Sequence, residues 1–170
     1  PKPVTSYEKG KMVEEKLFAK YAQSRNVKFS IIRLANVYGN VKNRGIVSFI
    51  FRSILDKIPL TVNGDGYQKR DFIFIEDAVK FIKFLIFYGQ NNLLVERFNI
   101  CTGQGYTIQD LIKITKKITK KKMDITYGRS IKEKMTIVGD NTKILKVSKI
   151  RLSYNIIRGL KKTYLNYCHE

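Results

Sequence analysis

Tyr7 and Lys11 are the first residues whose types and spacing suit chemistry. In a helix, side chains four residues apart lie on one face. A free tyrosine has a pKa of about 10, and a nearby lysine ammonium lowers that pKa because it favours the phenolate. Such a pair can take a proton from a hydroxyl during hydride transfer. The spacing alone is a weak signal, since Tyr38 and Lys42 repeat it.

Arg70 carries a side chain whose chemistry suits phosphate, and Asn36 is a polar residue just after an apolar run. A guanidinium is planar and can clamp a phosphate through two parallel hydrogen bonds. The alternative role for Arg70 is a salt bridge to the neighbouring Asp71. The alternative for Asn36 is a turn residue that ends a strand.

The cysteines and the histidine do not predict a metal site. Cys101 ends an apolar run and is interpreted as a buried small side chain, while His169 lies next to the last residue. No spacing resembles a zinc site, and two cysteines do not make a disulfide framework. We therefore expect no metal, and a reduced, cytoplasmic setting.

Length and charge limit the classes of protein and partner. The chain has 170 residues, about one domain, and a formal net charge of +19 that would suit a polyanion. The lysines of residues 113–122 alternate with apolar residues, which indicates a solvated helix face. A basic nucleic-acid-binding module is the less favoured alternative. No membrane partner is expected, because the most apolar stretch, residues 81–88, is far shorter than the roughly 20 residues that a bilayer needs.

The elements that must position these residues alternate between helix and strand patterns, which predicts an α/β fold with parallel sheet. We expect residues 28–34 to form a buried strand, and the end of the chain to form a smaller, mostly helical lobe. Helical spacing and capping signals predict helices over residues 7–25, 46–58, 76–88, 107–120, 141–146 and 154–167. Short apolar runs predict further strands over residues 60–62, 71–75, 97–101 and, at an edge, 125–127.

Five segments, in this order and spacing, resemble the extended short-chain dehydrogenases of the NAD-dependent epimerase/dehydratase family, which modify sugar nucleotides. They are PVTSYEKGK (residues 3–11), IRLANVYG (32–39), GDGYQKRDFIFIEDA (64–78), FNICTG (98–103) and GLKKT (159–163). The third segment is specific by itself, and together the five cover nearly the whole chain. The resemblance therefore implies the C-terminal part of a Rossmann-like parallel sheet with a smaller, mostly helical substrate-binding lobe.

The resemblance also implies a role for residues near the cofactor. Tyr7 would be the catalytic acid/base, and Lys11 would bind the nicotinamide ribose and tune Tyr7. Ala35 and Val37 would face the nicotinamide of NAD or NADP.

For the substrate, a nucleoside-diphosphate sugar, the resemblance implies that Asn36 donates to the diphosphate and Arg70 pairs with its phosphates. The family usually has a second phosphate-binding arginine where residues 133–140 stand here, and Lys134 is the candidate to replace it. Family members often dimerise through helices that include the tyrosine helix, so a homodimer is also implied.

Two hallmarks of the family are missing from the sequence. The glycine-rich turn that seats the dinucleotide pyrophosphate has no counterpart among these residues, and the catalytic Ser/Thr would also precede residue 1. We expect residues 1–34 and 71–101 to be the remainder of the NAD-binding Rossmann-like domain. Residues 35–70 and 102–170 would form the substrate-binding lobe, and the N-terminal glycine-rich half would be absent.

The expected function is therefore an NAD(P)-dependent epimerase or dehydratase of deoxysugar or surface-polysaccharide synthesis, represented by its C-terminal portion. The alternative is a catalytically inactive, truncated remnant. The sequence does not choose among epimerisation, dehydration and reduction.

Overall fold

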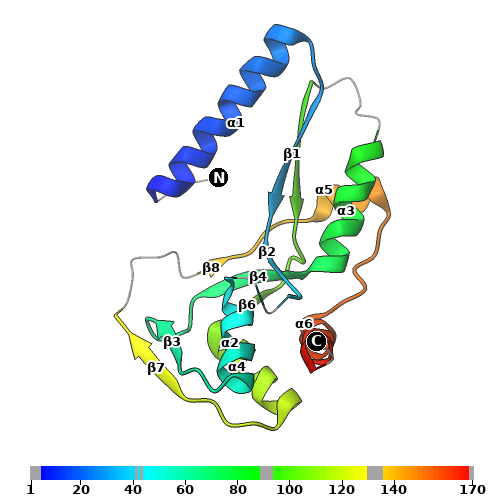
Figure 1. Cartoon of the computed structure of the whole chain (residues 1–170). Coiled ribbons are helices and arrows are strands. Elements are labelled where there is room, and N and C mark those ends of the chain that lie inside the picture. Colours follow the sequence, from blue (N-terminus) through cyan, green and yellow to red (C-terminus); the bar gives the residue numbers. More distant parts are fainter. Residues whose placement is uncertain (1–4, 41, 43, 89–93, 130–135, 169–170) are drawn as a thin grey trace.

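The structure is a computed structural model that describes residues 5–40, 42, 44–88, 94–129 and 136–168, and it is α/β as predicted (Figure 1). The helices are α1 (Ser6–Arg25), α2 (Ile46–Leu55), α3 (Ile75–Phe87), α4 (Ile108–Thr119), α5 (Thr142–Ser148) and α6 (Ile156–Cys168). The strands are β1 (Phe29–Leu34), β2 (Asn36–Tyr38), β3 (Leu60–Asn63), β4 (Lys69–Phe74), β5 (Val95–Ile100), β6 (Gly105–Thr107), β7 (Ile125–Gly128) and β8 (Thr136–Ile137).

Local sequence explains where the helices begin and end. Thr5 caps α1 through a reciprocal pair of bonds with Glu8, and Thr107 caps α4 in the same way. The prediction that α2 reaches residue 58 was wrong. The helix ends at Leu55 because Lys57 takes a left-handed backbone conformation, with φ of 56°.

Parallel pairing dominates the strands, as the α/β alternation predicts. β1 pairs with β5, β2 with β4, β3 with β7 and β8 with β4, all in parallel. β6 runs antiparallel to β4. The sequence did not predict β2, β6 or β8, because strands of two or three residues carry too little alternation to detect.

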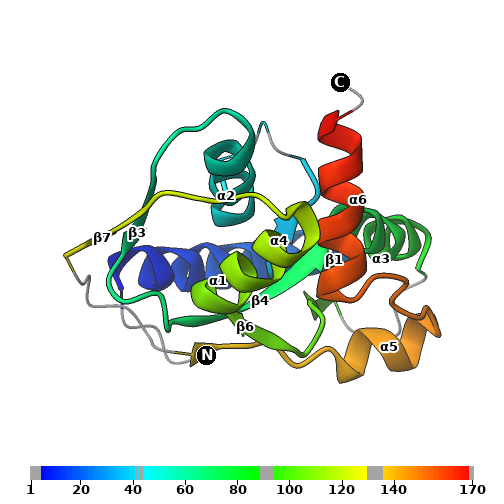
Figure 2. The ribbon, with the colours of Figure 1, turned by 90° about the horizontal axis from the view of Figure 1, so that it is seen from below.

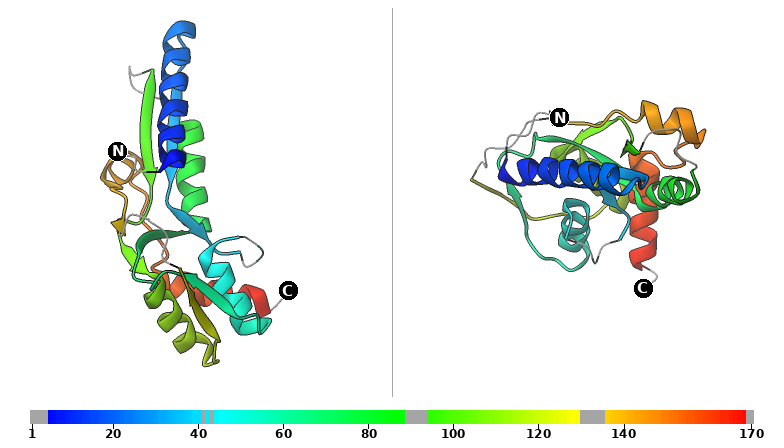
Figure 3. Two further views of the ribbon diagram at one scale, coloured as in Figure 1. Left: turned by 90° about the vertical axis from the view of Figure 1, so that its left-hand side faces the viewer. Right: turned by 90° about the horizontal axis from the view of Figure 1, so that it is seen from above.

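Two groups of buried apolar side chains lie on either side of β4. The larger group joins α2, α4 and α6 to β3 and to Tyr38 of β2. It forms the lower part of Figure 1. The second group joins α3, β5 and α5, with Phe81, Phe98 and Ile144 at its centre. Seen from the side, α1 and β1 project away from the part of the molecule that holds α2, α4 and α6 (Figure 3, left), and seen from below α1 runs behind β4 and α4 (Figure 2).

The expectation that β1 would be a buried strand was wrong. Residues Phe29 to Arg33 are only half-buried and Leu34 is exposed, whereas its partner β5 buries Glu96, Phe98 and Ile100. Within the described residues β1 pairs with β5 alone, so its other edge has no strand beside it. α1 covers β1 on one side, with Phe18 and Tyr21 against Phe29.

Candidate active site

A pocket of about 450 Å³ lies where β1 and β5 end. The two strands are in register, with Leu34 opposite Ile100, so Ala35 and Cys101 leave the sheet at the same edge. Ligands of parallel α/β sheets bind at this carboxyl edge. The pocket is therefore where the fold alone would place a site.

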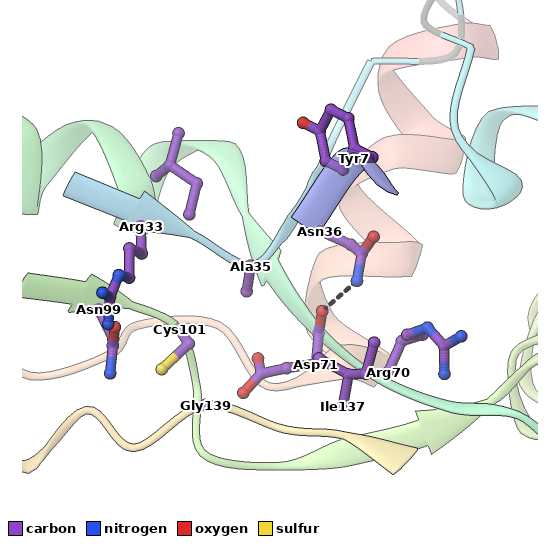
Figure 4. A pocket seen from close by; sticks show the side chains of 11 residues that line it. Tyr7, Arg33, Ala35, Asn36, Arg70, Asp71, Asn99, Cys101, Ile137 and Gly139 are labelled. Carbon is purple, nitrogen blue, oxygen red and sulfur yellow. Dashed lines mark hydrogen bonds between the residues drawn. The ribbon is translucent and has the colours of Figure 1, made fainter. Parts of the chain in front are cut away.

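Four of the predicted site residues meet in this pocket: Tyr7, Ala35, Asn36 and Arg70 line it together (Figure 4). They come from the start of α1, the end of β1, the start of β2 and from β4. Lys11 and Val37 do not line it. Lys134 and His169 lie outside the described residues.

Tyr7 stands at the first turn of α1 with 74% of its surface exposed. The Lys11 ammonium lies 5.8 Å from the centroid of the Tyr7 ring and donates a hydrogen bond of 2.8 Å to Glu14. The Glu14 carboxylate raises the pKa of Lys11 through this bond. Lys11 is therefore a cation near Tyr7, as predicted, but its direct partner is a carboxylate one turn further along the helix.

Asn36 is the first residue of β2 and not a turn residue. Its Nδ2 donates to the main-chain oxygen of Asp71 at 2.9 Å, across the parallel pair of β2 and β4 (Figure 4). Because a carbonyl oxygen can only accept, this bond fixes which way the amide points. One amide proton and Oδ1 of Asn36 remain for a ligand.

Arg70 is half-buried in β4, and its guanidinium donates to the Lys69 carbonyl at 3.0 Å. The carboxylate of the adjacent Asp71 accepts three bonds from the turn that follows β5. Thr102 donates its N–H at 2.9 Å and its hydroxyl at 2.7 Å to Oδ1, and the Gly103 N–H donates at 2.9 Å to Oδ2.

Sequence reasoning about chemistry missed Arg33, Asp71, Asn99 and Cys101, which also line the pocket. Arg33 binds Glu15 of α1 through two bonds of 2.7 and 2.6 Å, and these bonds lower the pKa of the Glu15 carboxyl. The signal that could have found Arg33, Asn99 and Cys101 is their position at or just beyond the carboxyl ends of the parallel strands β1 and β5. Asp71 is the third residue of β4, and this signal does not mark it.

Cys101 was expected to be buried, and it is, with 2% of its surface exposed. Burial raises the pKa of its thiol to about 11. The thiol is therefore protonated at neutral pH and forms part of the pocket wall.

Val37 lies in a second hollow of about 200 Å³ beside the pocket, together with Asn36 and the residues that start α2. Asn36 lines both cavities. The two hollows therefore share one polar residue.

The described residues offer neither a membrane span nor a metal site. They contain no helix long and apolar enough to cross a membrane. They also contain no group of three or more His, Cys, Asp or Glu side chains arranged to hold a metal ion.

Comparison with known proteins shows which family this sequence matches. The model of the NAD dependent epimerase/dehydratase family matches residues 1–101. An uncharacterized UDP-glucose epimerase of Bacillus subtilis is 30% identical over 131 residues, which cover 76% of this chain and 40% of that protein. The GDP-6-deoxy-D-talose 4-dehydrogenase of Aggregatibacter actinomycetemcomitans is 29% identical over 98% of this chain and 56% of its own length.

Solved structures show the same fold. The UDP-glucose 4-epimerase of Thermotoga maritima, solved with UDP-glucose, superposes with a TM-score of 0.86 and 28% identity over 100% of this chain and 56% of that one. The UDP-glucuronic acid 4-epimerase of Bacillus cereus, solved with UDP-glucuronic acid and NAD, has a TM-score of 0.89 and 24% identity, and covers 99% and 54%. The chain thus spans about half the length of these relatives.

Proposed function

This chain belongs to the NAD dependent epimerase/dehydratase family, and we propose that it carries the sugar-nucleotide site of an NAD(P)-dependent enzyme. The substrate class is a nucleoside-diphosphate sugar, and the reaction is an epimerisation, a dehydration or a reduction at a ring carbon. One observation carries the proposal: Tyr7 of α1, Ala35 between β1 and β2, Asn36 of β2 and Arg70 of β4 line a single pocket.

Arg70 and Asn36 suit the diphosphate. Both present N–H groups at the same pocket, and a guanidinium binds phosphate oxygens in pairs. The anchoring of Asn36 to the Asp71 carbonyl leaves its second amide proton to donate to a phosphate oxygen. The net charge of +19 also favours the approach of an anionic ligand.

Tyr7 suits the proton transfer. Its exposed side chain lies at the rim of the pocket, where its hydroxyl can take a proton from a sugar hydroxyl and later return it. Lys11 stabilises the resulting phenolate by its charge. The Lys11 ammonium has three N–H donors, and its bond to Glu14 uses one of them.

The residues present fit the nicotinamide end of a dinucleotide. Ala35 offers a small side chain at the edge of the sheet, Tyr7 lines the same pocket, and Lys11 lies next to Tyr7 on α1. The bound cofactor would supply hydride transfer to and from the sugar carbon. The printed sequence has no glycine-rich turn for the pyrophosphate, so these residues would hold only one end of the molecule.

We assign cofactor binding and substrate binding to two different sets of residues. Residues 1–34 and 71–101 would complete the NAD-binding domain, and residues 35–70 and 102–170 would form the substrate lobe. Support comes from the fact that the pocket draws on both sets of residues. Cytoplasmic surface-polysaccharide synthesis and a homodimer are part of the same proposal.

Calorimetric titration of the 170-residue chain with UDP-glucose, dTDP-glucose and GDP-mannose tests the substrate site. We expect one of these sugar nucleotides to bind. Arg70→Lys and Arg70→Gln should each weaken its affinity by about tenfold, because neither lysine nor glutamine offers the paired, planar donors of a guanidinium. Arg158→Gln, on the exposed face of α6, is the matched control and should bind normally. If none of the three sugars binds, the proposal is wrong.

The catalytic role is tested in a fusion that places a relative's glycine-rich strand–turn–helix segment before residue 1. Tyr7→Phe should abolish turnover in that fusion while leaving the binding of the sugar nucleotide intact. Turnover that survives the substitution would remove Tyr7 from the reaction.

A further inference from the structure

Asp71 occupies an unusual place for a carboxylate, because it is buried at the base of a pocket proposed to bind a diphosphate. Only 2% of its surface is exposed. A negative charge beside two phosphates would repel them unless hydrogen bonds to the protein already stabilise it. The role of Asp71 must therefore be read from its partners.

Those partners come from two segments that reach the pocket, at Asn36 and at Cys101. The Asp71 carboxylate accepts three bonds of 2.7 to 2.9 Å from Thr102 and Gly103, in the turn that leaves β5 next to Cys101. The Asp71 main-chain oxygen accepts the bond from Asn36, at the start of β2 on the opposite wall (Figure 4). One residue thus joins the strand that carries Asn36 to the turn that closes the other side.

The turn itself depends on this attachment. Gly103 has a φ of 74°, a conformation that other residues adopt at a cost, and its N–H points to the carboxylate. Behind the turn, the Asn141 side chain donates to the Cys101 carbonyl at 3.1 Å. A shift of the turn would therefore also move the segment that contains Gly139 and lines the pocket.

We propose that Asp71 is a positioning residue: its carboxylate holds the 101–103 turn against β4, and thereby keeps the wall of the pocket in register with Asn36 and Arg70. The inference rests on the proposed sugar-nucleotide site. Three of the roughly four acceptor positions of the carboxylate are taken by bonds to the turn, which suits a structural attachment.

Asp77 provides a matched control. It is equally buried, with 1% exposed, and its carboxylate also accepts backbone N–H groups, from Ser153 and Tyr154 at 2.9 Å each. It lies on α3 and does not line the pocket. Asp71→Asn and Asp77→Asn therefore each replace a buried carboxylate that binds backbone N–H groups, although Asp77 also pairs with Lys80 at 3.0 Å. Only Asp71 lines the pocket.

The sign of the effect on binding separates positioning from simple charge. Removing a negative charge near a diphosphate should by itself tighten binding, whereas loss of position should weaken it. In titrations with the sugar nucleotide that the unaltered chain binds, we expect Asp71→Asn to raise Kd about tenfold or more, with Asp77→Asn within about twofold. Thr102→Val, which removes the 2.7 Å hydroxyl bond to Asp71 together with the weaker bonds of that hydroxyl to the Gln104 main chain, should have a smaller effect in the same direction.

A second readout needs no ligand. The side-chain amide protons of Asn36, assigned in an NMR spectrum by comparison with Asn36→Asp, should show one hydrogen-bonded proton in the unaltered chain and in Asp77→Asn. In Asp71→Asn and Thr102→Val the peaks should shift towards those of a free amide.

Each outcome decides the inference. Tighter or unchanged binding in a folded Asp71→Asn chain, or unshifted Asn36 peaks, would overturn the positioning role while leaving the proposed function intact. If Asp71→Asn does not fold, the affinity and the Asn36 peaks of Thr102→Val decide between the two outcomes. If the unaltered chain binds no sugar nucleotide, the proposed function fails and this inference fails with it.

Discussion

Arg33 and Glu15 form a two-bonded ion pair that joins β1 to the middle of α1. The guanidinium Nε and Nη2 lie 2.7 and 2.6 Å from the two carboxylate oxygens, and Arg97 of β5 adds a bond of 3.3 Å to the same carboxylate. This pair fixes the helix that carries Tyr7 to the two strands that end at the pocket. Its loss should therefore loosen the attachment of Tyr7.

Glu15→Gln should lower the free energy of unfolding by about 1–3 kcal/mol, because it replaces charge-assisted hydrogen bonds with neutral ones and leaves Arg33 without its counter-charge. Urea unfolding followed by circular dichroism measures the loss. Glu14→Gln is the control on the same helix. Its partner Lys11 is exposed, so the change should cost no more than about 0.5 kcal/mol. Equal losses in the two variants would contradict the special role of Glu15.

The same pair predicts a pH dependence. Hydrogen bonds from Arg33 lower the folded-state pKa of Glu15, so its stabilising contribution is complete above the unfolded value of about 4.3. That contribution disappears as the pH falls through the lower, folded value. The stability difference between the unaltered chain and Glu15→Gln should therefore be constant near pH 7 and shrink below about pH 4. A difference that stays unchanged in acid would refute the assignment.

Gly159→Ala should destabilise the packing of α6 on β2. A methyl group at this buried glycine would overlap the Tyr38 hydroxyl and approach its Cζ to 2.8 Å, which should cost about 1–3 kcal/mol. The measurement is the thermal unfolding midpoint. Gly10→Ala is the control: nothing lies within 4 Å of the new methyl in α1, so it should raise stability by about 0.5–1 kcal/mol. Adding Tyr38→Phe to Gly159→Ala should recover part of the loss, and no recovery would place the strain elsewhere.

The two cysteines should differ in their reaction with a thiol reagent. Cys101 is buried and its pKa is raised to about 11, whereas Cys168 is exposed near the end of α6. At pH 8 a disulfide reagent should label Cys168 within minutes and Cys101 only after denaturation, since the thiolate is the reactive form. Prompt labelling of the folded Cys168→Ser variant would show that the pocket wall opens in solution.

The sequence by itself determined the helices, the longer strands and the types of residue at the site. Apolar spacing and reciprocal caps are local features, so α1 and α4 to within about one residue at each end, and most of β5, could be predicted without knowing what lies beside them. The motif segments also indicated Tyr7 and Arg70 before any geometry was known.

Only the tertiary structure decided which of these residues meet. Tyr7, Asn36 and Arg70 are far apart in the chain, and the parallel register of β1 with β5 and of β2 with β4 brings them to one pocket. Neither Asp71 as the link between the pocket walls nor the bond between Lys11 and Glu14 followed from spacing. Burial of β1 was predicted wrongly for the same physical reason: a strand's exposure depends on neighbours that its own residues do not specify.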